Sequence, residues 1–196
     1  MRSASFAALM AALCLAACSP VQEEVVVPLP PVPDERFTEV PEAPAPVEIS
    51  KAAARTRDEL IREATKGSLR GLGAIAARNP DFRSNVGGQS HDRFWDLLRR
   101  TGVDPNRKLR ELFEQPAGLR EIDGQRWYVW PDLAAKDAAD LIPEKLTFQD
   151  RRRLEELIRE DGIAKIRAGE GYPGMRTAIA EDGTWIYFVL GQDGEE

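Results

Sequence analysis

The chain has 196 residues and a formal net charge of −6, with 42% hydrophobic and 31% charged residues. This length suits one globular domain with further segments at its ends. Both cysteines, Cys14 and Cys18, lie in the N-terminal segment, so the rest of the chain has one histidine and no thiol, which excludes a zinc site built from nitrogen and sulfur ligands. The lack of a basic excess argues against a nucleic-acid-binding protein.

The N-terminus has the organisation of a secretory signal peptide. Arg2 supplies one positive charge, and an apolar run from Phe6 to Ala17 follows it. This run of about 12 residues is too short to cross a bilayer, which takes about 20 helical residues. We therefore expect residues 1–17 to be removed and to take no part in the fold.

Leu15-Ala16-Ala17-Cys18 closes this run and resembles the lipobox of bacterial lipoproteins. The resemblance implies that Cys18 receives a diacylglyceryl group, that cleavage falls between Ala17 and Cys18, and that the new amine is acylated, for example by palmitate. Several acyl chains together anchor a protein stably in a membrane. Ser19 stands where the family's inner-membrane retention signal has Asp, so the resemblance favours the outer membrane, facing the periplasm, in a cell with two membranes. The alternative is an ordinary secretory signal with a chance cysteine.

Residues 19–49 form a compositionally distinct segment, with eight of the 14 prolines and seven acidic residues against one base, Arg36. Proline removes backbone donors and like charges repel, so this segment cannot build a core. With Cys18 it is predicted to be a disordered, extended tether over 18–49. An alternative for Val25-Val26-Val27 is a short strand that pairs with a partner's sheet.

Residues 50–196 have the size of one domain, and the tether's acids leave them a net charge near −1. Capping residues and apolar spacing predict several helices. They are Ser50 to Lys66, Leu69 to Arg78, Asp92 to Arg100, one opened by Asp104-Pro105, and one opened by Thr147 with Asp150, which resembles a capping box.

Two Asp-Gly pairs, Asp123-Gly124 and Asp182-Gly183, each separate two strand-like runs. Such a pair favours a type I′ hairpin, in which both turn residues have positive φ. Trp127 and Trp185 follow their turns at similar places, which hints at a repeated unit. We predict an α+β fold: a small antiparallel sheet of about four strands, formed by two Asp-Gly hairpins and packed with five or six helices.

The search for catalytic groups finds little. The motifs GxxxxGK[ST], GxGxxG, HExxH and GxSxG are absent from the sequence. His91 is the single histidine; it could be a general base beside Ser90 or Asp92, but adjacent residues point apart, so a capping or surface role is favoured. We therefore assign no catalytic residue, metal or cofactor. A glycosidase that uses two carboxylates stays open, because its acids can come from anywhere in the chain.

The candidate binding residues centre on the stretch from Arg167 to Arg176, where three glycines and a proline surround polar side chains. Glu170, Tyr172 and Arg176 could form a recognition site on a loop, although a plain turn with a packed tyrosine explains them as well. Trp130 and His91 complete the candidate set. If Trp130 and Tyr172 are exposed together, a saccharide- or peptide-binding cleft is expected.

Two runs, WYVWPDLA (127–134) and GYPGMRTAIAEDGTWIYFV (171–189), resemble an uncharacterised bacterial envelope domain, a resemblance that implies a location and no activity. The leading hypothesis is a non-catalytic lipoprotein, held by its N-terminal lipid, whose domain binds or braces an envelope protein or glycan. The alternatives are a carboxylate-dependent hydrolase of cell-wall glycan and a purely structural lipoprotein.

Overall fold

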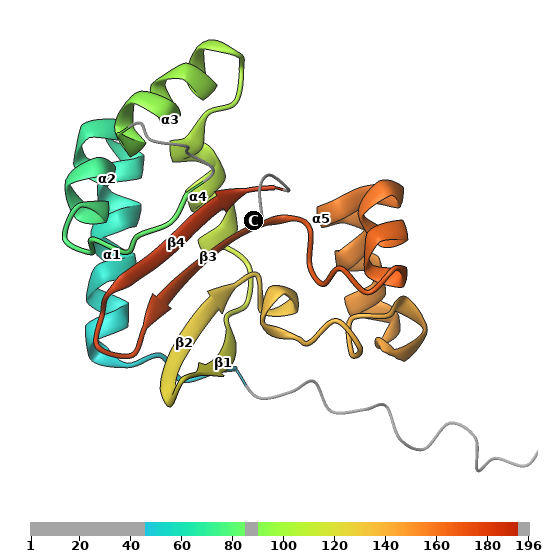
Figure 1. The fold of residues 1–196 in the computed structure, drawn as a ribbon. Helices are drawn as coiled ribbons and strands as arrows, with labels where there is room; N and C mark the ends of the chain where they lie inside the picture. The colour runs from blue at the N-terminus through green and yellow to red at the C-terminus, as the bar shows by residue number, and fades with distance from the viewer. Residues whose placement is uncertain (1–45, 85–89, 192–196) are drawn as a thin grey trace, which may run out of the picture. The chain divides into compact units, whose positions relative to one another are not determined.

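A computed structural model describes residues 46–84 and 90–191 (Figure 1). The predicted signal peptide, the lipobox with Cys18, and the tether as far as residue 45, including Val25-Val26-Val27, lie outside the described residues. The chain divides into two units, 1–43 and 44–196, and only the second is discussed below.

The domain is α+β, as predicted, with five α-helices and one sheet of four strands in the described residues. None of the described helices is both long and apolar enough to span a bilayer. In chain order the elements are α1 (Lys51–Thr65), α2 (Leu69–Ala76), α3 (His91–Arg100), α4 (Pro105–Phe113), β1 (Gly118–Ile122), β2 (Gln125–Trp130), the 3-10 turns η2 (Asp132–Ala135) and η3 (Pro143–Lys145), α5 (Phe148–Arg167), β3 (Met175–Ala180) and β4 (Trp185–Leu190).

The helix starts follow from local chemistry. Ser50, Asp104 and Thr147 each accept a hydrogen bond from a backbone N–H of the helix that they precede, which satisfies one of its free donors. Of the two hydrogen bonds in the capping box predicted at Thr147, the one from Asp150 N to Thr147 Oγ1 is present. The Asp150 carboxylate instead accepts from Arg153 Nη1 at 3.1 Å. Val47 and Ile49 pack against the core, so the packed part of the chain includes residues before Ser50.

The strands run antiparallel in the order β1-β2-β3-β4. The turn between β1 and β2 is the predicted one, with φ of 51° at Asp123 and 76° at Gly124. In the second hairpin only Gly183 of the Asp-Gly pair has positive φ, 92°. The type I′ prediction is therefore wrong for this turn: Ala180 N donates to Thr184 O at 2.8 Å, and the Asp182 carboxylate accepts from Thr184 N at 2.8 Å.

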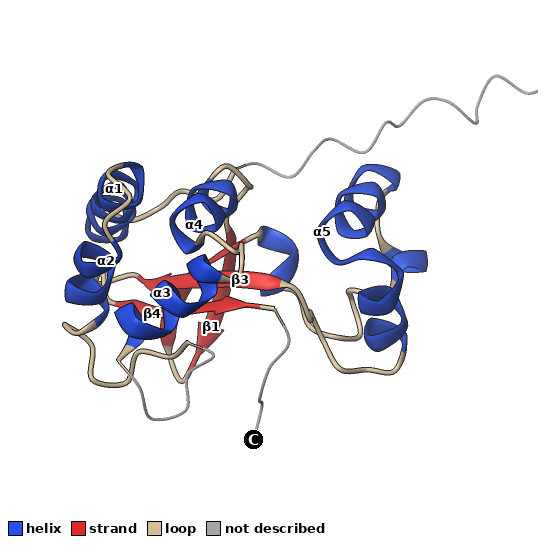
Figure 2. Cartoon of the chain, turned by 90° about the horizontal axis from the view of Figure 1, so that it is seen from above, coloured by secondary structure: helices blue, strands red, loops and turns tan. Residues whose placement is uncertain are grey.

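The sheet separates two hydrophobic clusters, with α1–α4 on one face and α5 on the other (Figures 1 and 2). Side chains alternate between the faces along each strand. Trp127 is the third residue after Gly124, whereas Trp185 is the second after Gly183, so the two indoles belong to opposite clusters. The hint of a repeated unit is therefore wrong.

The cluster under α1–α4 is aromatic. Phe82, Trp95, Trp185 and Phe188 are buried there, with ring centroids between 4.5 and 6.2 Å apart. Trp185 Nε1 donates to Thr177 Oγ1 at 2.8 Å, which satisfies the buried indole donor. Such contacts bury large apolar areas with defined ring geometry.

The cluster under α5 is mainly aliphatic, with Leu133, Leu141, Leu154 and Ile166 at its centre. α5 is broken within its length, because Arg159 has φ 57° and ψ −173°. The break separates two helical pieces, and both contribute buried side chains to the cluster.

Candidate functional site

The structure does not bring the five candidate binding residues together. Trp130 is 2% exposed and packs edge-on against Phe113 in the first cluster, with ring centroids 5.1 Å apart. Tyr172 is 8% exposed and belongs to the second cluster, on the other face of the sheet. The condition set for a cleft at these two rings is therefore not met.

Tyr172 acts as a core residue. Its hydroxyl is buried without a hydrogen-bond partner among the described residues, and burial raises the pKa of the phenol, with Arg176 acting in the opposite direction. Arg176 Nη1 donates to the carbonyls of Tyr172 and Gly174 at 3.2 Å each, so it braces the loop. Glu170 is exposed on the same loop.

His91 begins α3 and is half-buried. Its Nδ1 lies 2.8 Å from Ser84 Oγ, and its ring packs edge-on against Phe82 at 4.8 Å. Burial lowers the pKa of the imidazole, and Asp92 partly opposes this shift. The predicted capping or surface role is thus wrong, because the ring joins the aromatic cluster and holds Ser84 against α3.

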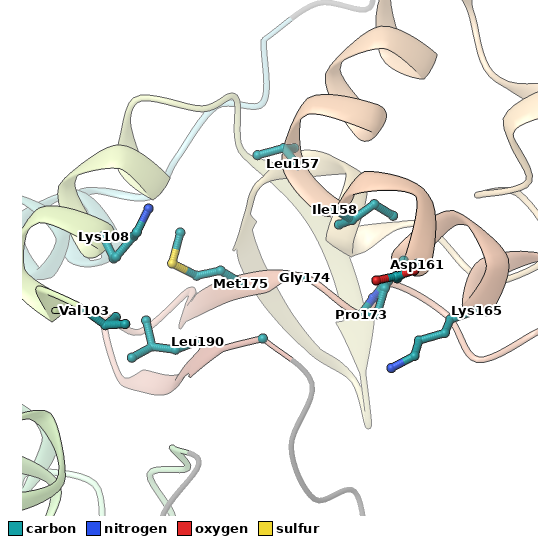
Figure 3. A pocket seen from close by; sticks show the side chains of 12 residues that line it. Val103, Lys108, Leu157, Ile158, Asp161, Lys165, Pro173, Gly174, Met175 and Leu190 are labelled. Carbon is teal, nitrogen blue, oxygen red and sulfur yellow. The ribbon is translucent and has the colours of Figure 1, made fainter. Parts of the chain in front are cut away.

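A groove of about 460 Å³ lies where α4 and α5 approach the end of the sheet (Figure 3). Its floor is formed by Met175 and Leu190, which are the first residue of β3 and the last of β4. Ile158 of α5 lines one side and Val103, before α4, the other. We refer to this as the α4–α5 groove.

The predicted loop does contribute to this groove, but through Pro173, Gly174 and Met175 rather than through Glu170, Tyr172 and Arg176. Gly174 is required by close packing: a Cβ there would lie 2.7 Å from Ile158 Cγ2 and from the Tyr172 hydroxyl. The buried tyrosine therefore supports the groove from behind.

Charged groups stand on both sides of the apolar floor. Lys108 comes from α4 and Lys165 from α5, with Met175 and Leu190 between them (Figure 3). Lys108 Nζ lies 2.9 Å from Glu111, whereas Lys165 forms no ion pair with any described residue. Asp161 is the one acidic residue among the described residues that line the groove. The groove thus offers apolar contact with a cationic margin.

The break in α5 falls in the wall of this groove. Leu157 and Ile158 precede Arg159, and Asp161, Gly162 and Lys165 follow it; all five line the groove. The Arg159 conformation is one that residues with a Cβ rarely adopt, and such strain is concentrated at functional sites. Neither the break nor the groove was expected from the sequence, although Gly162 inside a helix was a signal of close packing.

A second cleft, of about 670 Å³, lies on the α5 face of the sheet, next to the two hairpin turns. It is lined by Trp127 and Gln125 of β2, Ala180 of β3, and Asp182 of the following turn. Asp81 and Arg83, before α3, border it as well. We refer to this as the sheet cleft.

Hydrogen bonds displace the pKa of several described carboxyl groups. Among the described carboxyl groups whose pKa is displaced, those of Glu59, Asp92, Asp96 and Glu144 are all lowered, chiefly by hydrogen bonds from arginine or serine side chains. A general acid in a glycosidase has a raised pKa instead. In the part of the chain that the structure describes, no three His, Cys, Asp or Glu side chains lie close enough together to hold a metal ion.

No protein-family model, curated protein or solved structure matches this chain.

Proposed function

We propose that this protein is a lipid-anchored cell-envelope protein whose domain binds another envelope component and catalyses no reaction. The observation that carries the binding role is the α4–α5 groove, an apolar floor between two lysines, lined by residues on both sides of the break in α5. The lipobox at residues 15–18 supports the anchor at Cys18, and Ser19 supports an outer-membrane location facing the periplasm.

The groove suits a segment of an envelope protein that carries apolar side chains and an acidic group. Met175 and Leu190 provide apolar area, whose burial contributes about 25 cal/mol per Å². Lys165 would attract a carboxylate, and its charge adds orientation more than affinity. A partner bound in this way would be braced by the domain while the lipid holds the complex at the membrane.

Site-specific photo-crosslinking tests this proposal in intact cells. A photoreactive residue at Val103, in the groove, is expected to capture one partner, whereas the same residue at Leu119, which is exposed on β1, is not. Lys165→Glu should reduce the capture clearly, because a partner carboxylate would then be repelled, and Lys136→Glu, at an exposed site outside the groove, should preserve it. Capture that is equal from both positions, or unaffected by Lys165→Glu, would refute the groove as the binding site. Failure to capture any partner would favour the purely structural alternative.

The anchor is tested separately with Cys18→Ser. The intact mass of the wild-type protein should show the acyl groups, and the variant should lose both that mass and its membrane association. Membrane association that persists in the variant would refute lipidation as the anchor.

The glycan hydrolase remains the second candidate because Asp81 and Asp182 line the same cleft. Carboxylate pairs that cut glycosidic bonds must flank the bond from two sides. Release of soluble fragments from purified cell-wall glycan by the full chain, lost in both Asp81→Asn and Asp182→Asn, would establish this activity and overturn the non-catalytic proposal.

A further inference from the structure

The sheet cleft exists because the α5 layer covers only part of its face of the sheet. On that face Val129 of β2 and Ala178 of β3 are buried in the second cluster. Two residues further towards the hairpin turns, Trp127 and Ala180 are cross-strand partners and line the cleft. The alternation of strand side chains places all four on one side of the sheet. The cleft is therefore the part of this face that α5 does not cover.

Trp127 forms the aromatic wall of this cleft. The indole is half-buried and packs against Tyr187, with ring centroids 6.3 Å apart at 63°. Its Nε1 has no hydrogen-bond partner among the described residues, so packing alone positions the ring. The cross-strand partner is Ala180, whose side chain ends at Cβ and so covers less of the indole than a larger residue would.

The polar groups around the indole include both donors and acceptors. Gln125 contributes an amide, Asp81 and Asp182 contribute carboxylates, and Arg83 contributes a guanidinium. Part of this set is held in place: the Asp182 carboxylate accepts from Thr184 N at 2.8 Å, and Asp81 N donates to Asn79 Oδ1 at 3.0 Å. Two acids and one base give no cationic excess, which disfavours phosphate groups and nucleic acid.

We propose that the sheet cleft binds a neutral glycan chain. A sugar ring has an apolar C–H face, which would lie on Trp127, and hydroxyl groups at its rim, which would pair with Gln125, Asp81 and Asp182. Pockets of this kind combine aromatic contact with a few placed polar groups. The site is independent of the α4–α5 groove, so the domain would hold a protein partner at one surface and the envelope glycan at another.

The test is a titration of the full chain with a soluble β-linked N-acetylglucosamine tetramer, followed by tryptophan fluorescence and calorimetry. The wild-type protein should bind it saturably. Trp127→Ala should weaken binding by about tenfold or more, because the stacked ring is lost. Trp127→Phe keeps an aromatic face and should retain part of the affinity, which separates loss of stacking from loss of folding.

Gln125→Ala and Gln149→Ala form a matched pair of exposed glutamine variants, inside and outside the cleft. The first should weaken tetramer binding severalfold and the second should not change it. The absence of saturable binding by the wild type, or equal affinity of the wild type and Trp127→Ala, would overturn the proposal. Lys165→Glu should bind the tetramer normally, so failure of the groove proposal and failure of this one are distinguishable.

Discussion

The two faces of the sheet are closed by different means. Under α1–α4 the core is built from stacked and edge-on rings around Trp95 and Trp185. Under α5 it is built from aliphatic side chains, two 3-10 turns and a helix that breaks at Arg159. The sheet cleft lies on the α5 face, whereas the α4–α5 groove opens between the two faces: α5 lines one side of it, and its floor residues Met175 and Leu190 pack against the first cluster. We expect the first face, where large rings are fully buried, to contribute more to the stability of the domain, and the second face to leave the sheet cleft open to other molecules.

The largest expected effect is the loss of a ring from the first face. Trp95 is fully buried and lies 5.9 Å from both Trp185 and Phe188, so Trp95→Ala should destabilise the domain by about 3–5 kcal/mol. Urea denaturation followed by circular dichroism measures this change.

Tyr172→Phe is the counterpart on the second face. It removes a buried hydroxyl that has no partner among the described residues, so it should be neutral or stabilising by up to about 1 kcal/mol. A destabilisation of the same size as that of Trp95→Ala would contradict the proposed division between the faces.

Two helical glycines allow a closer comparison. A Cβ at Gly162 of α5 would lie 2.7 Å from Ile158 Cβ, so Gly162→Ala should cost about 1–3 kcal/mol by overpacking. At Gly71 of α2 the added Cβ would meet the end of the flexible Glu63 side chain and, at 2.9 Å, the capping Ser68 Oγ, so the gain in helix propensity should leave Gly71→Ala less destabilising than Gly162→Ala. Thermal unfolding of both variants ranks them, and stabilisation by both would show that helix propensity rather than packing at the groove decides.

The break in α5 gives a smaller effect. Glycine adopts positive φ without the steric cost that a Cβ carries, so Arg159→Gly should stabilise the domain by about 1 kcal/mol. Arg152→Gly, in a regular part of the same helix, should destabilise by about 1 kcal/mol. Urea midpoints compare the two variants; destabilisation in both would mean that Arg159 is not strained.

What the sequence predicts well in this domain depends on neighbouring residues. Ser50, Asp104 and Thr147 cap helices, and Asp123-Gly124 forms its turn, because each acts on backbone groups within three residues. Trp130 and Tyr172 could not be assigned in this way, since their distance from one another is set by which face of the sheet each side chain enters.

The groove could be predicted even less. It depends on the approach of α4 and α5 to the ends of β3 and β4, and on a break at Arg159 that no proline or glycine at that position announces. Gly162 and Gly174 carried the available signal, because a glycine in a helix or beside a buried side chain indicates close approach of two backbones. The residues that line the groove are spread from 103 to 191, so the site could be recognised only once the tertiary structure was known.

The smallest expected effect concerns pH and returns to the first face. Burial lowers the pKa of His91 in the folded state below its unfolded value of about 6.5, while Ser84, Asp92, Phe82 and Trp95 face the ring. Between the two pKa values the unfolded chain binds more protons, so stability should fall as the pH decreases below about 6.5.

His91 is the chain's single histidine, and His91→Gln should flatten this part of the profile. Urea midpoints measured from about pH 8 to about pH 5 in both proteins test it. An equal decline in the variant would assign the acid sensitivity to carboxylates such as Glu59, whose lowered pKa also makes protonation unfavourable to the fold, and would leave the aromatic face without a titrating group.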